Sequence, residues 1–443
     1  MENTFCFSGP GGIVSRRPSF FLATIGVIAC LAGLACSREA TPIPDLPPAS
    51  ASLPEPEGLP AWRRAAINSV LEGRVFMGSR SGYVALVARN GRLIHAKTAG
   101  FQDVEEQIPM SMETRFQMAS MTKPIIATAA MILVEEGRLD LDDLVSDYLP
   151  KVGTMSVAVL NEAGDIIGTT PQTTPMKIRH LLSFSSGIGG AGFEKTPLDQ
   201  RWEQDGLYTG EGSLGERVER LAALPLFEQP GTRWRYGASL DVMARIIELI
   251  VAEPLEVFLE QRIFTPLEMH ATRYGKDTPT DVPLATMYLQ DEDGHLVPDS
   301  GPLYHAADWT PGGSGLVSTA PDYMRFALML WNEGEFNGVR ILEKETVRQM
   351  KRIEVKSGVL KAMGIEGLGF GLGVSVVVDE EAAILPSRNG DFWWSGAYGT
   401  HFWVSPSTGI VLVVLQQNKM TENGGTPIAP SLVQQFALTD STN

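Results

Sequence analysis

The sequence has 443 residues, of which 44% are hydrophobic and 20% are charged, a composition typical of a globular protein. Its formal net charge is −16 and it contains no lysine- and arginine-rich run, which argues against a nucleic-acid partner. A chain of this length can bury a sizeable core and form one large domain or two.

Residues 1–36 are predicted to be an export signal. Two consecutive arginines precede an almost wholly apolar run of 16 residues that is somewhat short for a membrane span. The run ends at Cys36, and this arrangement resembles a bacterial lipoprotein signal, in which such a cysteine is acylated. Cys30, which lies within the run and also follows a small residue, is the alternative lipidation site. A plain secretory signal with incidental cysteines is the other interpretation.

The three cysteines all lie in this N-terminal part of the chain. On the Cys36 interpretation the mature body holds no disulfide and no thiolate metal site, and we expect no metal or other cofactor. Residues 37–60 are rich in proline and are predicted to be a tether. We therefore expect a protein exported to the bacterial periplasm or cell envelope, which meets the membrane only through a lipid anchor.

The catalytic region is predicted to begin at residue 61. Residues 61–72 have the pattern of a helix. Two apolar runs then flank Asn90-Gly91, which is a strong signal for a β-hairpin. A helix that begins at Ser120 is expected to stop near Gly137.

The segment from about 140 to 310 is predicted to be mainly helical, and strands are expected to return after it. The expected helices there include residues 178–183, 214–224 and 239–251, and a further one spans 321–332. Strands are expected at residues 370–378, 391–397, 400–404 and 410–416. The predicted fold class is therefore α/β: an antiparallel sheet flanked by helices, with an inserted all-helical domain. Within a catalytic region of residues 61–440, residues 61–139 and 311–440 form the α/β part and 140–310 the helical part.

One short motif supplies a candidate nucleophile and a candidate base. Ser120-Met-Thr-Lys123 places a hydroxyl and an amine at positions i and i+3, which share one face of a helix. The start of a helix favours developing negative charge, and S-x-x-K is a known signature of an activated serine. A single S-x-x-K is a weak match, so the motif needs partners elsewhere in the chain.

Two later motifs supply such partners. Tyr236 lies just before an apolar helix, and Trp394-Ser395-Gly396 lies in the last predicted strands. The order S-x-x-K, Tyr, W-S-G resembles that of the penicillin-recognising serine hydrolases, a family with a β-lactamase-like fold. The chain is most similar to the branch with class C β-lactamases, D-alanyl-D-alanine peptidases and family VIII carboxylesterases. The resemblance covers roughly residues 60–420.

The resemblance implies a role for each matching residue. Ser120 would be the acylated nucleophile, and Lys123 and Tyr236 would share the proton transfers. Lysine and tyrosine are both poor bases unless each perturbs the other, so either of them remains a candidate for the base. The backbone N–H groups of Ser120 and Ala397 would form the oxyanion hole, and Trp394, Ser395 and Gly396 would lie against the substrate.

Two departures from the family pattern point to the substrate. Lactamases and peptidases of this kind carry Tyr-x-Asn, whereas Ala238 stands here in place of the asparagine. They also carry Lys-Thr-Gly, and Trp394 replaces the cation that would hold a carboxylate. We therefore predict a serine carboxylesterase that cleaves small esters of short acyl chains. One alternative is a β-lactamase or D-alanyl-D-alanine peptidase, and the other is a non-catalytic penicillin-binding sensor. The sequence does not indicate the oligomeric state.

Overall fold

The computed structural model describes residues 58–162, 164–190, 196–204, 212–277, 284–299, 309–361, 365–419 and 428–438. The predicted export signal, both candidate lipidation cysteines and nearly all of the tether lie outside these residues, so those predictions remain untested. Within the described ranges, no helix combines the length and the apolar character that crossing a membrane requires.

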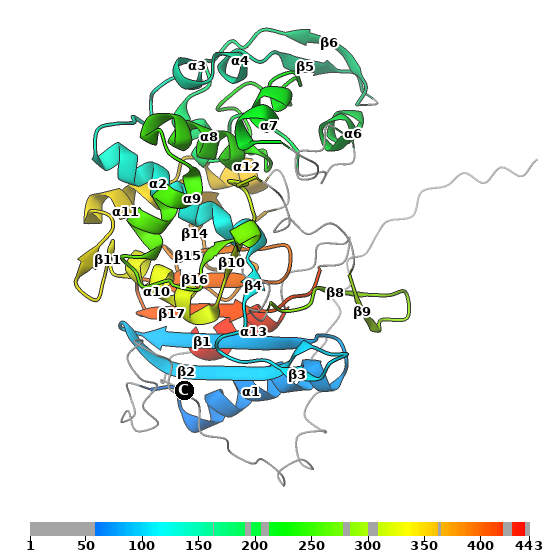
Figure 1. The fold of residues 1–443 in the computed structure, drawn as a ribbon, viewed down its shortest axis with the longest axis vertical. Coiled ribbons are helices and arrows are strands. Elements are labelled where there is room, and N and C mark those ends of the chain that lie inside the picture. Colours follow the sequence, from blue (N-terminus) through cyan, green and yellow to red (C-terminus); the bar gives the residue numbers. More distant parts are fainter. Residues whose placement is uncertain are drawn as a thin grey trace, which may run out of the picture. The chain divides into compact units, whose positions relative to one another are not determined.

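An antiparallel sheet of eight strands organises the structure (Figure 1). The strand order is β13-β14-β15-β16-β17-β1-β2-β3, so the first strand of the chain pairs with the last. The strands are β1 (Gly82–Arg89), β2 (Arg92–Asp103), β3 (Ile108–Pro109), β13 (Leu368–Phe370), β14 (Ser375–Val377), β15 (Phe392–Ser395), β16 (His401–Ser405) and β17 (Ile410–Leu415).

Alternating side chains give the sheet two buried faces. Strand β1 directs Val84 and Leu86 into the larger core, and Tyr83 and Ala85 into a second core on the opposite face. Helices α1 (Ala61–Phe76) and α13 (Ile428–Leu438) cover the second core, while α2 (Thr122–Glu135) and α10 (Ala320–Trp331) contribute to the larger one. A sheet buried on both faces explains why its central strands are almost wholly apolar.

The segment between α2 and α10 is largely helical and also holds short strands. Its helices are α3 (Val145–Tyr148), α4 (Pro150–Gly153), α5 (Ile178–Leu182), α6 (Pro197–Gln204), α7 (Leu214–Leu221), α8 (Ser239–Val251) and α9 (Leu255–Leu259), followed by the turns η2 (Glu260–Phe264) and η3 (Gly275–Asp277). Two hairpins also belong to it: β5 (Val157–Leu160) with β6 (Ile166–Thr170), and β8 (Tyr288–Gln290) with β9 (Leu296–Pro298).

A small three-stranded sheet, β4-β10-β7, lies next to the start of α2. Its strands are β4 (Phe116–Gln117), β7 (Arg273–Tyr274) and β10 (Leu316–Ser318). The remaining elements are the hairpin β11 (Glu335–Phe336) with β12 (Val339–Arg340), and the helices α11 (Lys344–Met350) and α12 (Ser357–Lys361).

The predicted fold class is confirmed, and most predicted elements are present. The Asn90-Gly91 hairpin forms as expected, with φ of 50° and 77° at the two turn residues. The single strand predicted at 370–378 is wrong: it is a hairpin of β13 and β14, broken where Gly371 approaches the Met350 carbonyl and Gly373 adopts a φ of 78°. The division into 61–139 plus 311–440 and 140–310 stays a prediction.

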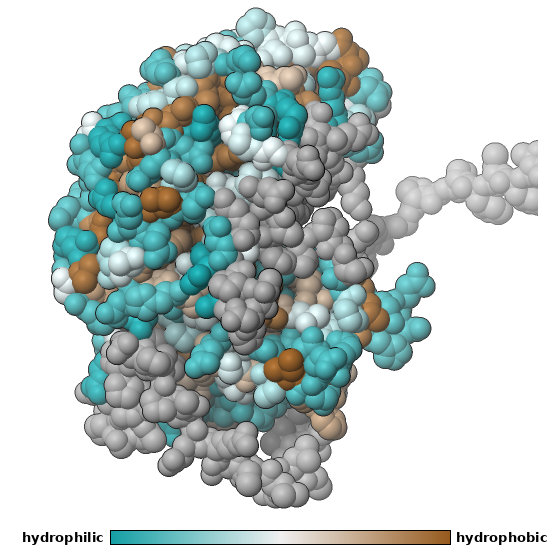
Figure 2. All heavy atoms as spheres, viewed as in Figure 1, coloured by the Kyte–Doolittle hydropathy of each residue, from teal (hydrophilic) through white to brown (hydrophobic). Residues whose placement is uncertain are grey.

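A substitution in the second core tests how much its packing contributes to the stability of the sheet. We expect Leu412→Ala to lower the free energy of unfolding by about 2–5 kcal/mol, because Leu412 is fully buried in β17 and its loss leaves a cavity. The measurement is chemical denaturation. Ile384 is the control, because this residue is 64% exposed. Figure 2 shows other isolated hydrophobic residues on a largely hydrophilic surface. Ile384→Ala should change the value by no more than about 0.5 kcal/mol, and an equal loss in both variants would contradict the expectation.

Candidate active site

Two side chains, those of Lys123 and Tyr236, contact the hydroxyl of Ser120. The three residues come from two separate segments of the chain. The Lys123 Nζ lies 3.1 Å from Ser120 Oγ, and the Tyr236 hydroxyl lies 2.6 Å from the same oxygen. The Lys123 ammonium also lies 4.7 Å from the centre of the Tyr236 ring. The structure thus brings the three predicted catalytic residues together with nucleophile-to-base distances suited to proton transfer.

Ser120 lies in a strained turn immediately before α2. The turn is a short 3₁₀ helix, Ala119–Met121, and Ala119 adopts a φ of 47°, which is unfavourable for a residue with a side chain. Hydrogen bonds hold the turn from two sides: the Met118 N–H donates to the Leu316 carbonyl, and the Tyr323 hydroxyl donates to the Met121 carbonyl, both at 2.8 Å. The nucleophile is therefore fixed by β10 and α10 before any substrate binds.

Lys123 is buried and has a second acceptor besides the serine. Its side chain, on a residue only 4% exposed, donates to the Gly313 carbonyl at 2.6 Å. Gly313 lies in the loop before β10, close to α8. A buried amine needs such partners because desolvation without them is costly.

Tyr236 is fixed by the loop that follows α5. The Arg235 N–H donates to the Phe184 carbonyl at 2.7 Å, and the Ala238 N–H donates to the Gly189 carbonyl at 2.9 Å. Gly237 is required between them, since a Cβ there would lie 2.1 Å from the Gly189 oxygen. These contacts hold the tyrosine segment against that loop, just ahead of α8.

Aromatic rings pack around Tyr236. Its ring centre lies 5.0 Å from that of Phe184, 5.8 Å from that of Trp234 and 5.7 Å from that of Trp394. Phe370 completes the group, with its ring centre 5.2 Å from that of Trp394. We call these five rings the aromatic cluster. Trp394 therefore belongs to an apolar wall beside the nucleophile, at the position where the sequence resemblance leads one to expect a lysine.

The end of β15 lies directly against the nucleophile turn. A Cβ on Gly396 would lie 2.4 Å from the Met118 carbonyl and 2.2 Å from Thr400 Oγ1, so only glycine fits. Thr400 Oγ1 in turn donates to the Met118 carbonyl at 3.0 Å. Ala397 is the next residue in the chain. That its backbone N–H and that of Ser120 form the oxyanion hole remains a prediction.

Ser395 is engaged with a buried histidine. Its Oγ lies 2.8 Å from His401 Nδ1 on the neighbouring strand β16. Burial lowers the pKa of His401 to about 3, so the ring is neutral, and its Nδ1 either accepts a hydrogen bond from the serine hydroxyl or donates one to it. The Ser395 side chain is thus tied to the sheet, and its predicted contact with substrate remains untested.

Sequence reasoning missed several groups around the site. It assigned no role to Gly313, whose carbonyl accepts from Lys123, or to Asp241, whose carboxylate accepts from the Gly313 N–H at 3.1 Å. It also missed Phe184 and Phe370 in the aromatic cluster. A carboxylate inside the apolar run of α8 was the one available signal for Asp241.

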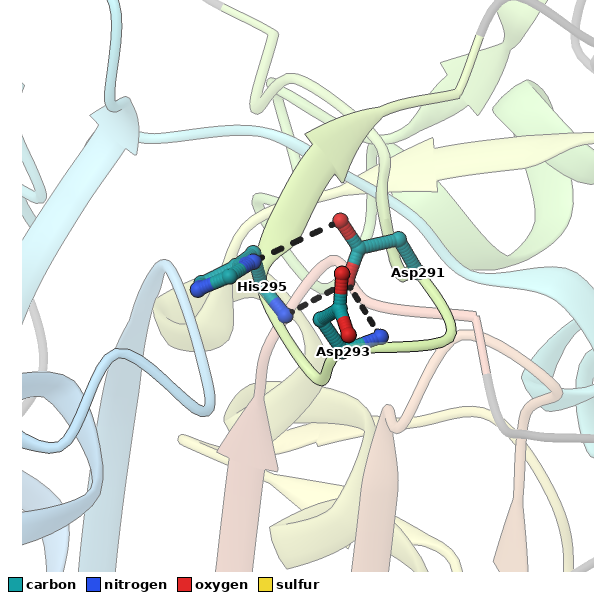
Figure 3. Close-up of side chains that lie close together, drawn as sticks. All are labelled: Asp291, Asp293 and His295. Carbon is teal, nitrogen blue, oxygen red and sulfur yellow. Dashed lines mark hydrogen bonds and ion pairs between the residues drawn. The ribbon is translucent and has the colours of Figure 1, made fainter.

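Two aspartates and a histidine lie close together away from the site. The hydrogen bonds of the turn that contains them explain why they are close. Asp291, Asp293 and His295 gather on the exposed hairpin between β8 and β9 (Figure 3). Asp291 Oδ1 accepts from the Asp293 N–H at 3.1 Å and from the His295 N–H at 2.8 Å. The carboxylate therefore closes the turn, and we assign the group no metal.

Comparison with known proteins places the chain among related sequences. The model of the Beta-lactamase family matches residues 67–435. The Mycobacterium tuberculosis protein Rv1367c is 34% identical over 352 residues, which cover 77% of this chain and 86% of that protein. Esterase EstB of Burkholderia gladioli is 29% identical over 355 residues, which cover 75% of this chain and 85% of that protein.

A solved structure agrees with these sequence matches. That of EstCE1, described as a hydrolase with promiscuous acyltransferase activity, superposes with a TM-score of 0.74 and 28% sequence identity. The superposition covers 85% of this chain and 99% of the other. The similarity thus extends over both the sheet and the helical segment.

The close contact at Gly396 generates a test of the site. We expect Gly396→Ala to lower kcat/KM for an ester by about 100-fold, because the added methyl must push the Met118–Ser120 turn out of position. Steady-state kinetics with a p-nitrophenyl ester measure this. Gly168→Ala is the control, since a Cβ there meets no atom within 4 Å. Unchanged kinetics in Gly396→Ala would show that the contact does not position the nucleophile.

Proposed function

The chain belongs to the beta-lactamase family, and on that premise we propose that it is a serine carboxylesterase acting through an acyl-Ser120 intermediate. The observation that carries the proposal is the meeting of Lys123 Nζ and the Tyr236 hydroxyl on one serine oxygen. An esterase and a hydrolase among the relatives support the same reaction class.

The arrangement accounts for both halves of the reaction. Ser120 Oγ attacks the acyl carbon, and its proton passes to the Lys123–Tyr236 pair. The pair returns that proton to the departing alkoxide, which leaves as an alcohol. A water molecule then attacks the acyl carbon and gives its proton to the same pair, and Ser120 recovers a proton as the carboxylic acid leaves.

The surroundings of the site favour a neutral ester. Trp394 and Ala238 stand where related lactamases carry a lysine and an asparagine, so two groups that would bind a carboxylate and an amide are missing from those positions. The aromatic cluster instead lines this side of the site with apolar surface. Short apolar acyl chains are the groups that such a wall would accept.

Two alternatives follow from the family. A β-lactamase or D-alanyl-D-alanine peptidase would use the same acyl-serine chemistry on a cyclic or peptide amide. A non-catalytic penicillin-binding sensor would form the acyl-serine and release it slowly. The loss of the carboxylate-binding cation disfavours the first, and the short distances within the triad disfavour the second.

Paired assays test the proposal. We expect hydrolysis of p-nitrophenyl butyrate to fall at least about 1,000-fold in Ser120→Ala, because the variant lacks the oxygen that would form the acyl intermediate. Tyr236→Phe should lower kcat by about 100-fold or more through loss of proton transfer. The control is Ser79→Ala, since Ser79 lies in the turn after α1, where its hydroxyl donates to the Arg74 carbonyl.

Three results would each point elsewhere. Full ester hydrolysis in Ser120→Ala would exclude the acyl-serine mechanism. Nitrocefin turnover comparable to ester turnover in the wild type would favour the lactamase. A fluorophosphonate or lactam adduct on Ser120 without any ester turnover, seen by mass spectrometry, would favour the sensor.

We further propose that the mature protein is a periplasmic or cell-envelope lipoprotein. The support is the apolar N-terminal run that ends at Cys36, followed by the proline-rich residues 37–60. In a bacterial host, labelled fatty acid should enter the wild type and the Cys30→Ser variant but not Cys36→Ser. Labelling that is lost only in Cys30→Ser would move the anchor to that cysteine, and no labelling of the wild type would indicate a plain secretory signal.

A further inference from the structure

Lys123 has a partner that the family motifs do not supply. Ala238 offers no side-chain acceptor in the position of the usual asparagine, and the lysine instead donates to the Gly313 carbonyl at 2.6 Å. A backbone carbonyl can take this role only if its peptide is held in a fixed orientation. The group that holds this peptide therefore affects the position of Lys123.

Asp241 holds that peptide from the opposite side. It lies one helical turn after Ala238 in α8, is only 4% exposed, and its Oδ1 accepts from the Gly313 N–H at 3.1 Å. Its Oδ2 lies 2.9 Å from the point that a Gly313 Cβ would occupy, and Lys123 Nζ lies 3.2 Å from the same point. The carboxylate and the amine thus lie on either side of Gly313.

The charges around Asp241 favour an interaction with the lysine. Lys123 on α2 stabilises the carboxylate, and Asp241 in turn acts electrostatically on Arg217 of α7 and Tyr274 of β7. Burial raises the pKa of Asp241, and Lys123 and the Gly313 N–H act in the opposite direction without cancelling that rise. Oδ2 makes no hydrogen bond of normal geometry within the described residues, so the charge of Lys123 contributes to its compensation.

We infer that Asp241 is a positioning residue for the acylation reaction: it orients the Gly313 peptide toward Lys123 and supplies the negative charge that balances the amine. The inference rests on the proposed function for its kinetic consequence only. The inferred electrostatic coupling of Asp241 to Lys123 does not depend on a substrate and can be measured without one.

The kinetic test uses Asp241→Asn, which keeps an acceptor for the Gly313 N–H and removes the charge. We expect kcat/KM for p-nitrophenyl butyrate to fall at least about 10-fold, mostly through kcat, since the side chain does not reach the serine. The pH profile should also change. The limb that reports proton loss at the site should move to lower pH by about one unit, because a nearby negative charge no longer opposes that loss.

A buried aspartate in a matched position provides the control. Asp322 is the third residue of α10, as Asp241 is of α8, and it is 7% exposed. Its carboxylate accepts from the Ala271 N–H and the Thr272 hydroxyl, away from the triad. Asp322→Asn is expected to leave both limbs of the pH profile in place, even if its melting temperature falls.

A second measurement needs no activity. Lys123→Met should lower the melting temperature, because it leaves the Asp241 carboxylate buried without its nearest balancing charge. Adding Asp241→Asn to that variant should then raise the melting temperature, whereas adding Asp322→Asn should not. If the wild-type protein did not hydrolyse esters, the proposed function would be wrong, but this measurement of melting temperatures would still be valid.

Two outcomes would each overturn the inference. One is an Asp241→Asn enzyme whose pH limbs coincide with those of the wild type. The other is a Lys123→Met/Asp241→Asn double variant that melts at or below Lys123→Met, which includes a double variant that fails to fold.

Discussion

The contact between the end of β15 and the turn before Ser120 is the constraint on which the site depends. Gly396 has no room for a side chain between Thr400 and the Met118 carbonyl. On the other side, the Met118 N–H is bonded to β10. The nucleophile is thus held between the large sheet and the small one, and the unfavourable φ of Ala119 persists because both sides determine it.

The parts of the fold that depend on local signals could be predicted from the sequence. The Asn90-Gly91 hairpin and the apolar helix α8 carry their own turn or periodicity signals, and both appear within a few residues of the expected bounds. The hairpin of β5 and β6 was not expected, because the sequence on both sides of it favours helices. The break between β13 and β14 follows from the close packing of Gly371 against Met350, which no local pattern reveals.

The same distinction applies to the site. Ser120, Lys123 and Tyr236 belong to motifs with a recognisable order, and the structure brings them together. Gly313 could not be found in this way, because its contribution is a backbone carbonyl placed by a loop almost 200 positions later in the chain. The role of a side chain can be predicted from its residue type, whereas the role of a backbone peptide group depends on where the fold places it.

The pairing of β1 with β17 also determines when the protein can become active. Val84 lies opposite Leu415, so the middle of the large sheet stays open until nearly the whole chain has left the ribosome. Ser120, Tyr236 and Gly396 likewise come from early, middle and late parts of the sequence. Such long-range pairing makes folding slow, because distant segments must meet before the sheet is complete. The nascent polypeptide therefore has no assembled catalytic site until its last strands have been synthesised.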